Sequence, residues 1–262
     1  QKKHLQKKFN LFPKIKNGPS GSFFCGKILF MKLAVSKEIF EKFPNVTIGV
    51  VVAEGVDNEA KKPEILKMVH GTQKKVKSDF EGKPIFEDPT IGAWRKVYKD
   101  FGAKKYRTSI EALVKRSIND DLLGSINNLV DLYNYISLKY ILPLGGEDLD
   151  KVEGDIVLAL ADGTERFIPI FSEEVEHPKP GEVVYKDDQD VMCRRWNWRE
   201  AEKTKLTEDT TNAVFVTEGT LSEERGRVEE ATKELAELIE KYCGGKMSVF
   251  FLDNKNTEVN FE

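Results

Sequence analysis

The sequence has few cysteines and no long apolar run, and each shortage excludes a class of protein. Its three cysteines are an odd number, lie far apart and form no CxxC pair: Cys25, Cys193 and Cys243. Such a set supports neither a disulfide framework nor a zinc ribbon, and it favours a reducing, cytoplasmic location. No apolar stretch approaches the roughly 18–20 residues that a membrane-spanning helix requires. We therefore expect a cytoplasmic chain that does not act at a membrane.

Histidine is scarce as well. The three histidines, His4, His70 and His177, have no metal-ligand spacing, so we expect no metal site. The chain also lacks an ATP-binding signature, a GxSxG nucleophile motif and a convincing catalytic triad. We therefore expect no bound cofactor and no covalent nucleophile.

The charge is unevenly distributed along the chain. The sequence has 41 basic and 44 acidic side chains, and residues 1–30 hold seven lysines and no acid. Residues 31–262 therefore have a net charge of −10. A broad nucleic-acid surface should be basic, so we expect no DNA partner, and any RNA contact must be a local patch.

Residues 1–30 form a basic leader that we expect to lie outside the native fold. A nucleic-acid arm, a transit peptide and an alternative start site are the three interpretations that remain open for it. Regular hydrophobic patterning begins at Met31. We find no internal repeat and no linker after that point, so residues 31–262 are expected to form a single domain.

Helices and strands alternate irregularly in residues 31–262. Helical spacing of apolar residues predicts helices over 59–80, from Asp88-Pro89 to Gly102, from about 109, and over 221–243. The middle is rich in strands, with a hairpin expected around Asp162-Gly163 and strands at 182–186, 190–195 and 212–217. The absence of a βαβ repeat favours an α+β fold, layered rather than doubly wound.

Residues 130–152, "VDLYNYISLKYILPLGGEDLDKV", resemble a motif of the phenylalanyl-tRNA synthetase beta chain. That motif reads roughly V-D-x-T-N-y-(apolar)-x-L-x-x-G-x-P-L-H-A-F-D-L-D-K. The positions in register are Asp131, Asn134, Leu138, Pro143, Leu144, Asp148, Leu149 and Asp150. The likeness extends over about residues 90–215. The chain is thus similar to the editing, tRNA-binding middle modules of the beta chain, in a freestanding form.

The resemblance implies a layered β/β/α fold with mixed sheets and a pocket for the aminoacyl end of tRNA. Hydrolysis in such a pocket needs an enzyme that positions water and stabilises an oxyanion. The implied partner is the aminoacylated 3′ end of tRNA, with possible transient association with the translation machinery. The chain alone is not expected to form aminoacyl-tRNA.

The sequence departs from the family motif at the expected pocket. Gly145 stands where the family has histidine, and Glu147 stands where it has an aromatic residue. The family's glycine-rich loop is replaced by residues 194–199, "RRWNWR". The family's specificity for tyrosine is therefore not expected here.

Several residues are candidates for the pocket. Asp131 and Asn134 lie in an apolar segment, where they either hold backbone groups or, for Asn134, reach the substrate. Gly145 and Gly146 form either a tight turn or a close backbone approach to a ligand.

Strand alternation over 194–199 would place Arg195, Asn197 and Arg199 together, facing the pocket, and the tryptophans in the core. Internal ion pairing is the alternative for these arginines. We expect Asn134, Arg195 and Asn197 to be catalytic. The substrate-binding candidates are Gly145, Gly146, Glu182, Arg199 and Thr211.

Residues 94–116 contain eight basic and two acidic side chains. Such a run is either a solvated helix face or a landing site for the tRNA backbone. The basic candidates are Arg95, Lys96, Lys99, Lys104, Lys105, Arg107, Lys115 and Arg116.

Two functions remain open. The first is hydrolysis of mischarged tRNA by a trans-acting aminoacyl-tRNA deacylase. The second is a non-catalytic tRNA- or amino-acid-binding module with the same fold, which the replacement of the family's histidine by Gly145 favours.

Overall fold

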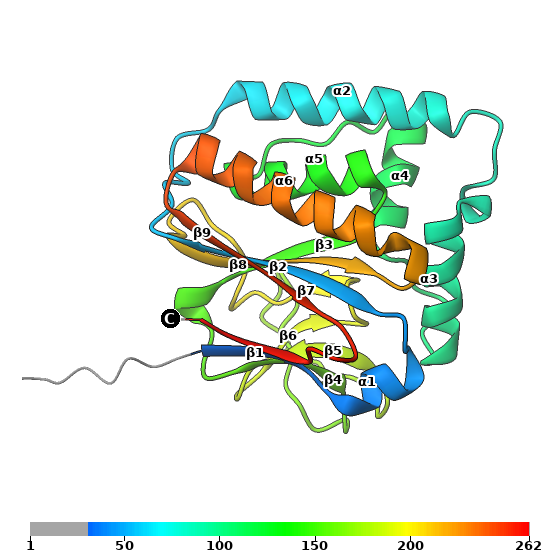
Figure 1. Ribbon diagram of the computed structural model, residues 1–262, viewed down its shortest axis with the longest axis vertical. Helices are drawn as coiled ribbons and strands as arrows, with labels where there is room; N and C mark the ends of the chain where they lie inside the picture. The colour runs from blue at the N-terminus through cyan, green and yellow to red at the C-terminus, as the bar shows by residue number, and fades with distance from the viewer. Residues whose placement is uncertain (1–30, 262) are drawn as a thin grey trace, which may run out of the picture.

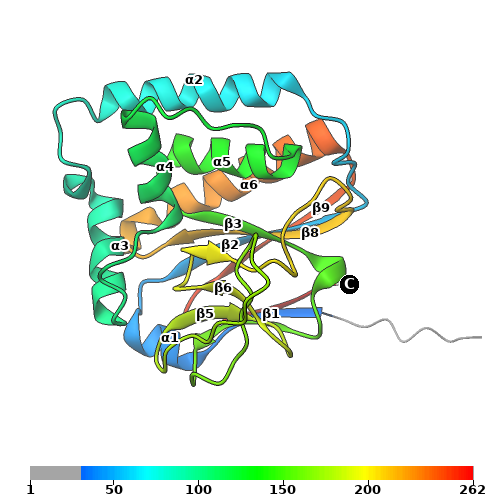
Figure 2. The same ribbon diagram turned by 180° about the vertical axis from the view of Figure 1, so that it is seen from behind.

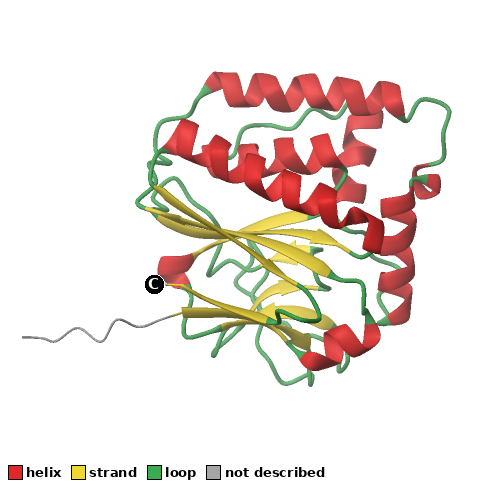
Figure 3. Cartoon of the chain, in the orientation of Figure 1, coloured by secondary structure: helices red, strands yellow, loops and turns green. Residues whose placement is uncertain are grey.

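The computed structural model describes residues 31–261, and they form two stacked β-sheets with most helices on one side (Figure 1). The six-stranded sheet is the outermost layer, the four-stranded sheet lies in the middle, and the helices cover its far face (Figure 3). The expected α+β, layered β/β/α architecture is confirmed. The predicted leader, 1–30, lies outside the described residues.

The six-stranded sheet is mixed. Its first strand, β1, pairs in parallel with β4, and every other neighbouring pair in the sheet is antiparallel. In spatial order the strands are β10 (Glu258–Phe261), β1 (Met31–Val35), β4 (Ile156–Leu160), β5 (Val183–Lys186), β6 (Val191–Arg194) and β7 (Arg199–Glu200).

The four-stranded sheet is antiparallel, in the order β3 (Leu144–Asp148), β8 (Asn212–Gly219), β2 (Thr47–Glu54) and β9 (Lys246–Leu252). Strand β2 is apolar along most of its length because both of its faces are covered. Val50 and Val52 join the core between the sheets. Val51 and Ala53 face the helices instead.

The helices form an outer layer on the four-stranded sheet. Helix α6 (Arg225–Cys243) packs on β2, α5 (Asn128–Tyr140) packs beside α6, and α2 (Pro63–Asp79) lies on α5. Helix α4 (Ser109–Ile118) packs against α2 and α5, while the short α1 (Lys37–Lys42) contacts β4. Among the described residues, no helix is both long and apolar enough to cross a membrane.

Helix α3 (Pro89–Asp100) stands at the side of the stack in both ribbon views (Figure 1, Figure 2). Asp88 caps it by accepting a hydrogen bond from the Ile91 N–H at 3.1 Å, and Pro89 occupies its first turn. Trp94 packs edge-on against Trp196, with ring centroids 5.1 Å apart. This contact places α3 across the end of the space between the sheets.

The prediction of a hairpin around Asp162-Gly163 is wrong for the strand expected after Gly163. Gly163 does turn the chain, with φ of 98°. Strand β4 nevertheless pairs with β1 and β5, while Phe167 bridges to Glu176. Local alternation cannot identify which distant strand takes the neighbouring position, and here β5 takes it.

The packing of α6 on β2 generates a prediction for Gly49. A Cβ atom at Gly49 would overlap the side chain of the buried Thr232 on α6. We expect Gly49→Ala to lower the free energy of unfolding by about 1–3 kcal/mol, because the helix must shift. Urea denaturation measures this change.

The matched control is Gly71→Ala on the exposed face of α2, where an added Cβ meets no atom within 4 Å. Alanine there should stabilise the protein by about 0.5–1 kcal/mol. Equal changes in the free energy of unfolding at Gly49 and Gly71 would contradict close packing between β2 and α6.

Candidate active site between the two sheets

A cavity lies between the two sheets and receives residues from both. Its volume is about 30 Å³. A cavity of this volume holds one or two water-sized groups. Its polar or small lining residues include Gly145, Gly146, Glu147, Asn197, Glu200 and Glu218.

Glu218 on β8 is fixed by three hydrogen-bond donors. Its Oε1 accepts from Tyr185 Oη and from Trp196 Nε1, each at 2.7 Å. Its Oε2 accepts from Asn197 Nδ2 at 2.8 Å. Burial raises the pKa of Glu218 to about 7, although the three donors stabilise the carboxylate. This carboxyl group can therefore exchange a proton near neutral pH.

Glu147 on β3 and Glu200 on β7 bring two more carboxyl groups to the cavity. Burial raises the pKa of both, and the adjacent Glu200 carboxylate raises the pKa of Glu147 further. The Oε2 atoms of both residues are buried, and no other described residue donates to them, although the two carboxyl groups interact with each other. The two groups repel each other when both are ionised, so Glu147 stays protonated to a higher pH.

Gly145 and Gly146 line the cavity, as expected for a close backbone approach. Both lie in β3 and pair with β8, so they are strand residues and not a tight turn. A Cβ atom at Gly146 would lie 2.5 Å from the Phe215 ring, and one at Gly145 would lie 3.1 Å from Glu200 Oε1. A larger side chain at Gly145 would therefore point into the cavity, whereas one at Gly146 would point at Phe215 and Leu206 in the core on the helix side of the sheet.

Asn197 also lines the cavity, but the expected strand through residues 194–199 is wrong. Strand β6 ends at Arg194, and 195–198 form a turn that leads to β7. Arg195 and Trp196 adopt positive φ angles of 51° and 69°, which side chains other than glycine rarely adopt. Tyr98 Oη donates to Asn197 Oδ1 at 2.9 Å. The Asn197 amide is therefore held between α3 and Glu218.

Arg195 is not brought to the cavity, because the turn reverses the side-chain alternation. Its guanidinium stacks 3.7 Å from the ring centroid of Tyr106 and 4.4 Å from that of Trp198. The Arg195 Nε lies 3.8 Å from Glu182 Oε2. The side chain is buried, yet its position is outside the lining of the cavity.

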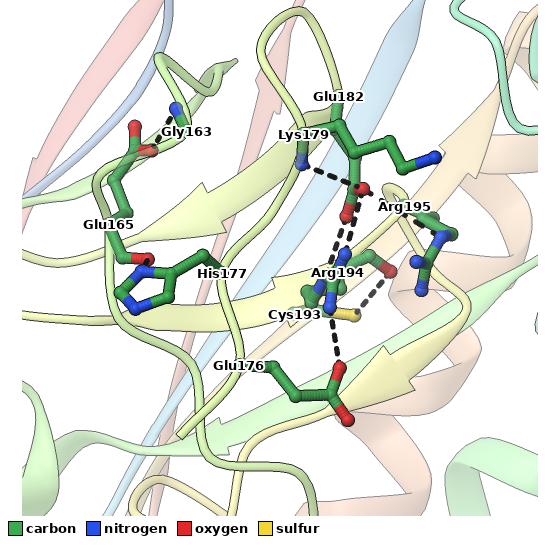
Figure 4. A network of polar contacts seen from close by, with 9 residues as sticks. All are labelled: Gly163, Glu165, Glu176, His177, Lys179, Glu182, Cys193, Arg194 and Arg195. Atoms are coloured by element: carbon green, nitrogen blue, oxygen red, sulfur yellow. Dashed lines mark hydrogen bonds and ion pairs between the residues drawn. The ribbon is translucent and has the colours of Figure 1, made fainter.

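Glu182 is held by an arginine, as in the ion-pairing alternative. Arg194 donates to its two carboxylate oxygens at 2.7 and 3.0 Å, and also to Glu176 at 2.6 Å. Figure 4 shows Arg194 between these two carboxylates, with Arg195 to one side. Glu182 is therefore engaged in a buried ion pair away from the cavity, where it cannot receive an amino-acid ammonium without releasing Arg194.

Three other candidates lie outside the cavity. Asn134 is on α5, in the layer beyond the four-stranded sheet. The exposed Thr211 donates to Asp150 at 3.2 Å, and Arg199 lies over the Trp198 ring. Asp131, by contrast, has the structural role considered for it, since it accepts the Ile126 N–H at 3.1 Å.

The carboxyl groups were not among the residues expected in the site. Glu218 ends an apolar strand and Glu147 replaces an aromatic residue, and both are signals of burial. Glu200 carries no comparable signal. Glu147 and Glu218 belong to the four-stranded sheet, and Glu200 belongs to the six-stranded sheet. The three carboxyl groups meet only because the two sheets stack.

A cationic groove lies on α3 and the loop after it. Its volume is about 460 Å³, and Tyr98 and Tyr106 contribute to its wall. The cations that line it are Arg95, Lys96, Lys99, Lys104 and Arg107. Tyr98 lines the groove, and its hydroxyl donates to Asn197 of the cavity, so this buried side chain lies between groove and cavity.

The basic candidates differ in how they are paired. Arg95 and Arg107 both contact Glu111, at 2.6 and 2.8 Å. Arg116 pairs with Asp121 at 2.7 Å, outside the groove. Within residues 31–261 no acidic partner lies within 4 Å of the other exposed lysines of the strip, namely Lys96, Lys99, Lys104, Lys105 and Lys115. Of these five, Lys105 and Lys115 do not line the groove.

Comparison with known proteins gives one family and two groups of similar chains. The model of the B3/4 domain matches residues 93–244. The phenylalanine–tRNA ligase beta subunit of Aquifex aeolicus is 46% identical over 102 residues, covering 34% of this chain and 13% of that protein. The corresponding subunit of Fusobacterium nucleatum is 35% identical over 72 residues, covering 27% and 9%.

This chain spans about a tenth of the length of these curated relatives. A solved N-terminal fragment of the phenylalanyl-tRNA synthetase beta subunit from Pyrococcus horikoshii is also similar. Its TM-score is 0.44 at 16% identity, over 82% of this chain and 49% of that one.

The raised pKa values in the cavity predict a pH-dependent stability. The pKa of each of these carboxyl groups is higher in the folded protein than in the unfolded chain, where glutamate has a pKa of 4.5. Below pH 4.5 such a group makes its full contribution to stability. The contribution is lost as the pH rises through the pKa of the folded state. The free energy of unfolding should therefore fall between pH 5 and pH 8. Glu147→Gln removes one such group and should be more stable than the unmodified protein at pH 8, by about 1–3 kcal/mol.

Urea denaturation at both pH values tests this prediction. Glu237→Gln, an exposed position on α6, is the control and should leave the pH dependence unchanged. A Glu147→Gln variant that loses as much stability as the unmodified protein between pH 5 and pH 8 would contradict it.

Proposed function

The chain belongs to the B3/4 domain family, and from this premise we propose that it hydrolyses the ester bond of mischarged aminoacyl-tRNA. The resemblance to the phenylalanyl-tRNA synthetase beta chain is confirmed by its similarity to two beta subunits. The observation that best supports hydrolysis is the connection of the cationic groove to the carboxyl-lined cavity through Tyr98, Asn197 and Glu218.

The groove suits the backbone of the tRNA acceptor end. Lysines without acidic partners neutralise phosphates, and the half-buried Tyr106 offers an aromatic surface to an unpaired base, whereas Tyr98 is buried. Binding there would bring the 3′-terminal ester near Tyr98 and Asn197, which lie between groove and cavity.

Glu218 is the proposed general base. Its Oε2 accepts only one hydrogen bond, from Asn197, so a lone pair remains for a water molecule. A pKa of about 7 suits proton transfer at neutral pH. Water adds to the ester carbonyl and gives its proton to Glu218. The 3′ oxygen of tRNA then leaves and takes that proton back, which regenerates the carboxylate.

Asn197 acts in this scheme as a positioning residue. Its Nδ2 donates to Glu218 and its Oδ1 accepts from Tyr98, so its polar atoms are engaged in holding the base. No catalytic role is proposed for Arg195 or Asn134, because both lie outside the cavity.

A non-catalytic tRNA- or amino-acid-binding module remains the alternative. Gly145 occupies the place of the family's histidine, and the inner cavity is narrow. Both observations fit a protein that has kept the binding surface and lost the chemistry.

A panel of mischarged tRNAs distinguishes the two functions. With micromolar protein we expect hydrolysis of at least one member, measured as loss of acid-precipitable labelled amino acid. Glu218→Gln should slow this reaction about 10²–10⁴-fold, the usual contribution of a general base. Glu237→Gln on the exposed face of α6 is the matched control and should retain full activity.

Because Glu218 also holds the sheets together, the thermal midpoint of each variant must be measured beside its rate. Survival of every mischarged tRNA, with tRNA binding retained, would reject hydrolysis in favour of the binding module. Equal activity of a folded Glu218→Gln variant would reject Glu218 as the base.

The groove generates a separate prediction for tRNA affinity. Replacing Lys99 and Lys104 by alanine should weaken binding and lower the slope of log K against log salt by about 1–2, since each phosphate contact releases about one counterion. Filter binding across a salt series measures both. Alanine at the exposed Lys67 and Lys74 of α2 is the control, and an equal effect there would contradict a local landing site.

A further inference from the structure

Two carboxyl oxygens in the cavity accept no hydrogen bond from any other residue of the described chain, and their two carboxyl groups lie close enough to interact with each other. They are Glu147 Oε2 and Glu200 Oε2, and both are buried. Glu147 is only 8% exposed as a residue. A buried polar atom without a partner costs free energy, more so when it bears charge. Because these oxygens lie beside a cavity, we expect them to accept hydrogen bonds from a ligand that enters it.

Glu218 differs from this pair. Its two oxygens already accept three hydrogen bonds from Tyr185, Trp196 and Asn197. A ligand would have to displace one of these donors to bind Glu218 as strongly. Glu147 and Glu200 are therefore the carboxyl groups of the cavity that a ligand can supply with hydrogen bonds.

The cavity has no basic side chain to neutralise its carboxyl groups. Three glutamates line it, and no lysine, arginine or histidine of the described chain does so. In a poorly solvated space this arrangement favours a cation over an anion or a neutral group. A ligand hydroxyl could donate one hydrogen bond, whereas an ammonium donates three and also offsets the negative charge.

The dimensions of the cavity limit what can enter. A volume of about 30 Å³ suits a group of about the size of water, such as an ammonium, and is too small for an aromatic ring. Gly145 keeps this space open, since a Cβ there would lie 3.1 Å from Glu200 Oε1.

We propose that Glu147 and Glu200 bind a protonated primary amine, which makes this pair the amine-recognition site of the cavity. The inference rests on the proposed function in one respect, because the amine would belong to the aminoacyl group of the tRNA. The α-ammonium and a side-chain ammonium have the same chemistry, and the experiment separates them.

Three small probes test the site without any tRNA. L-Phenylalaninamide has only an α-ammonium, Nα-acetyl-L-lysinamide has only a side-chain ammonium, and Nα-acetyl-L-alaninamide has neither. The indole N–H of Trp196, which lines the cavity and donates to Glu218, reports binding by NMR. We expect at least one amine to shift this signal at a concentration ten-fold or more below that required by the neutral amide.

Variants identify the residues that recognise the amine. Glu147→Gln and Glu200→Gln should each reduce the preference for the amine over the neutral amide at least five-fold, because glutamine retains the size but cannot become a carboxylate when the ammonium binds. Glu237→Gln on α6 is the matched control and should keep the full preference. The thermal midpoint of unfolding shows whether each variant is folded. If one of the two variants does not fold, the other still tests the site.

The outcomes separate this inference from the proposed function. Equal binding of amine and neutral amide, or binding of none of the probes, would overturn the amine site. Hydrolysis of N-acetylated aminoacyl-tRNA as fast as the free-amine form would also overturn it, while leaving the deacylase activity intact. Amine binding that depends on Glu147, in a protein that hydrolyses no member of the tRNA panel, would support the site and reject the hydrolysis.

Discussion

The hydrogen bonds of Glu218 join parts of the molecule that are distant in the sequence. This carboxyl group on β8 binds Tyr185 on β5 of the other sheet, and Trp196 and Asn197 in the turn after β6. Trp196 in turn packs against Trp94 on α3. Burial of a carboxyl group is unfavourable unless donors surround it, so these elements are held in one arrangement. The position of α3, and with it the groove, depends on that arrangement.

Acidic side chains lie inside this part of the molecule, and basic side chains lie at its surface. Carboxyl groups of Glu147, Glu200 and Glu218 lie inside, where poor solvation raises their pKa values. Lysines of the groove lie at the surface, where water and salt screen them. Tyr98 lies between the two regions. An overall acidic chain can thus present a local site for a polyanion, and an acidic interior next to it can receive the cationic end of a ligand.

Prediction from the sequence succeeded where the determinant is local. The helix that begins after Asp88 depends on one cap and a proline, and both lie within four residues of its start. Prediction failed at the hairpin around Gly163 and at the turn 195–198, because the pairing of β4 with β5 and the positive φ of Arg195 and Trp196 are imposed by distant contacts.

The sequence by itself determined the layered α+β class, the starts of α3 and α4, the basic strip at 94–116 and the kinship with the synthetase beta chain, because periodicity, capping and motif spacing are properties of neighbouring residues. Only the tertiary structure decided which polar side chains meet. Glu147, Glu200 and Glu218 come from three strands of two sheets, and Arg195 was turned away from them by a single reversal of the chain. Their convergence follows from sheet stacking, which depends on contacts over the whole length of the chain and leaves no trace in local spacing.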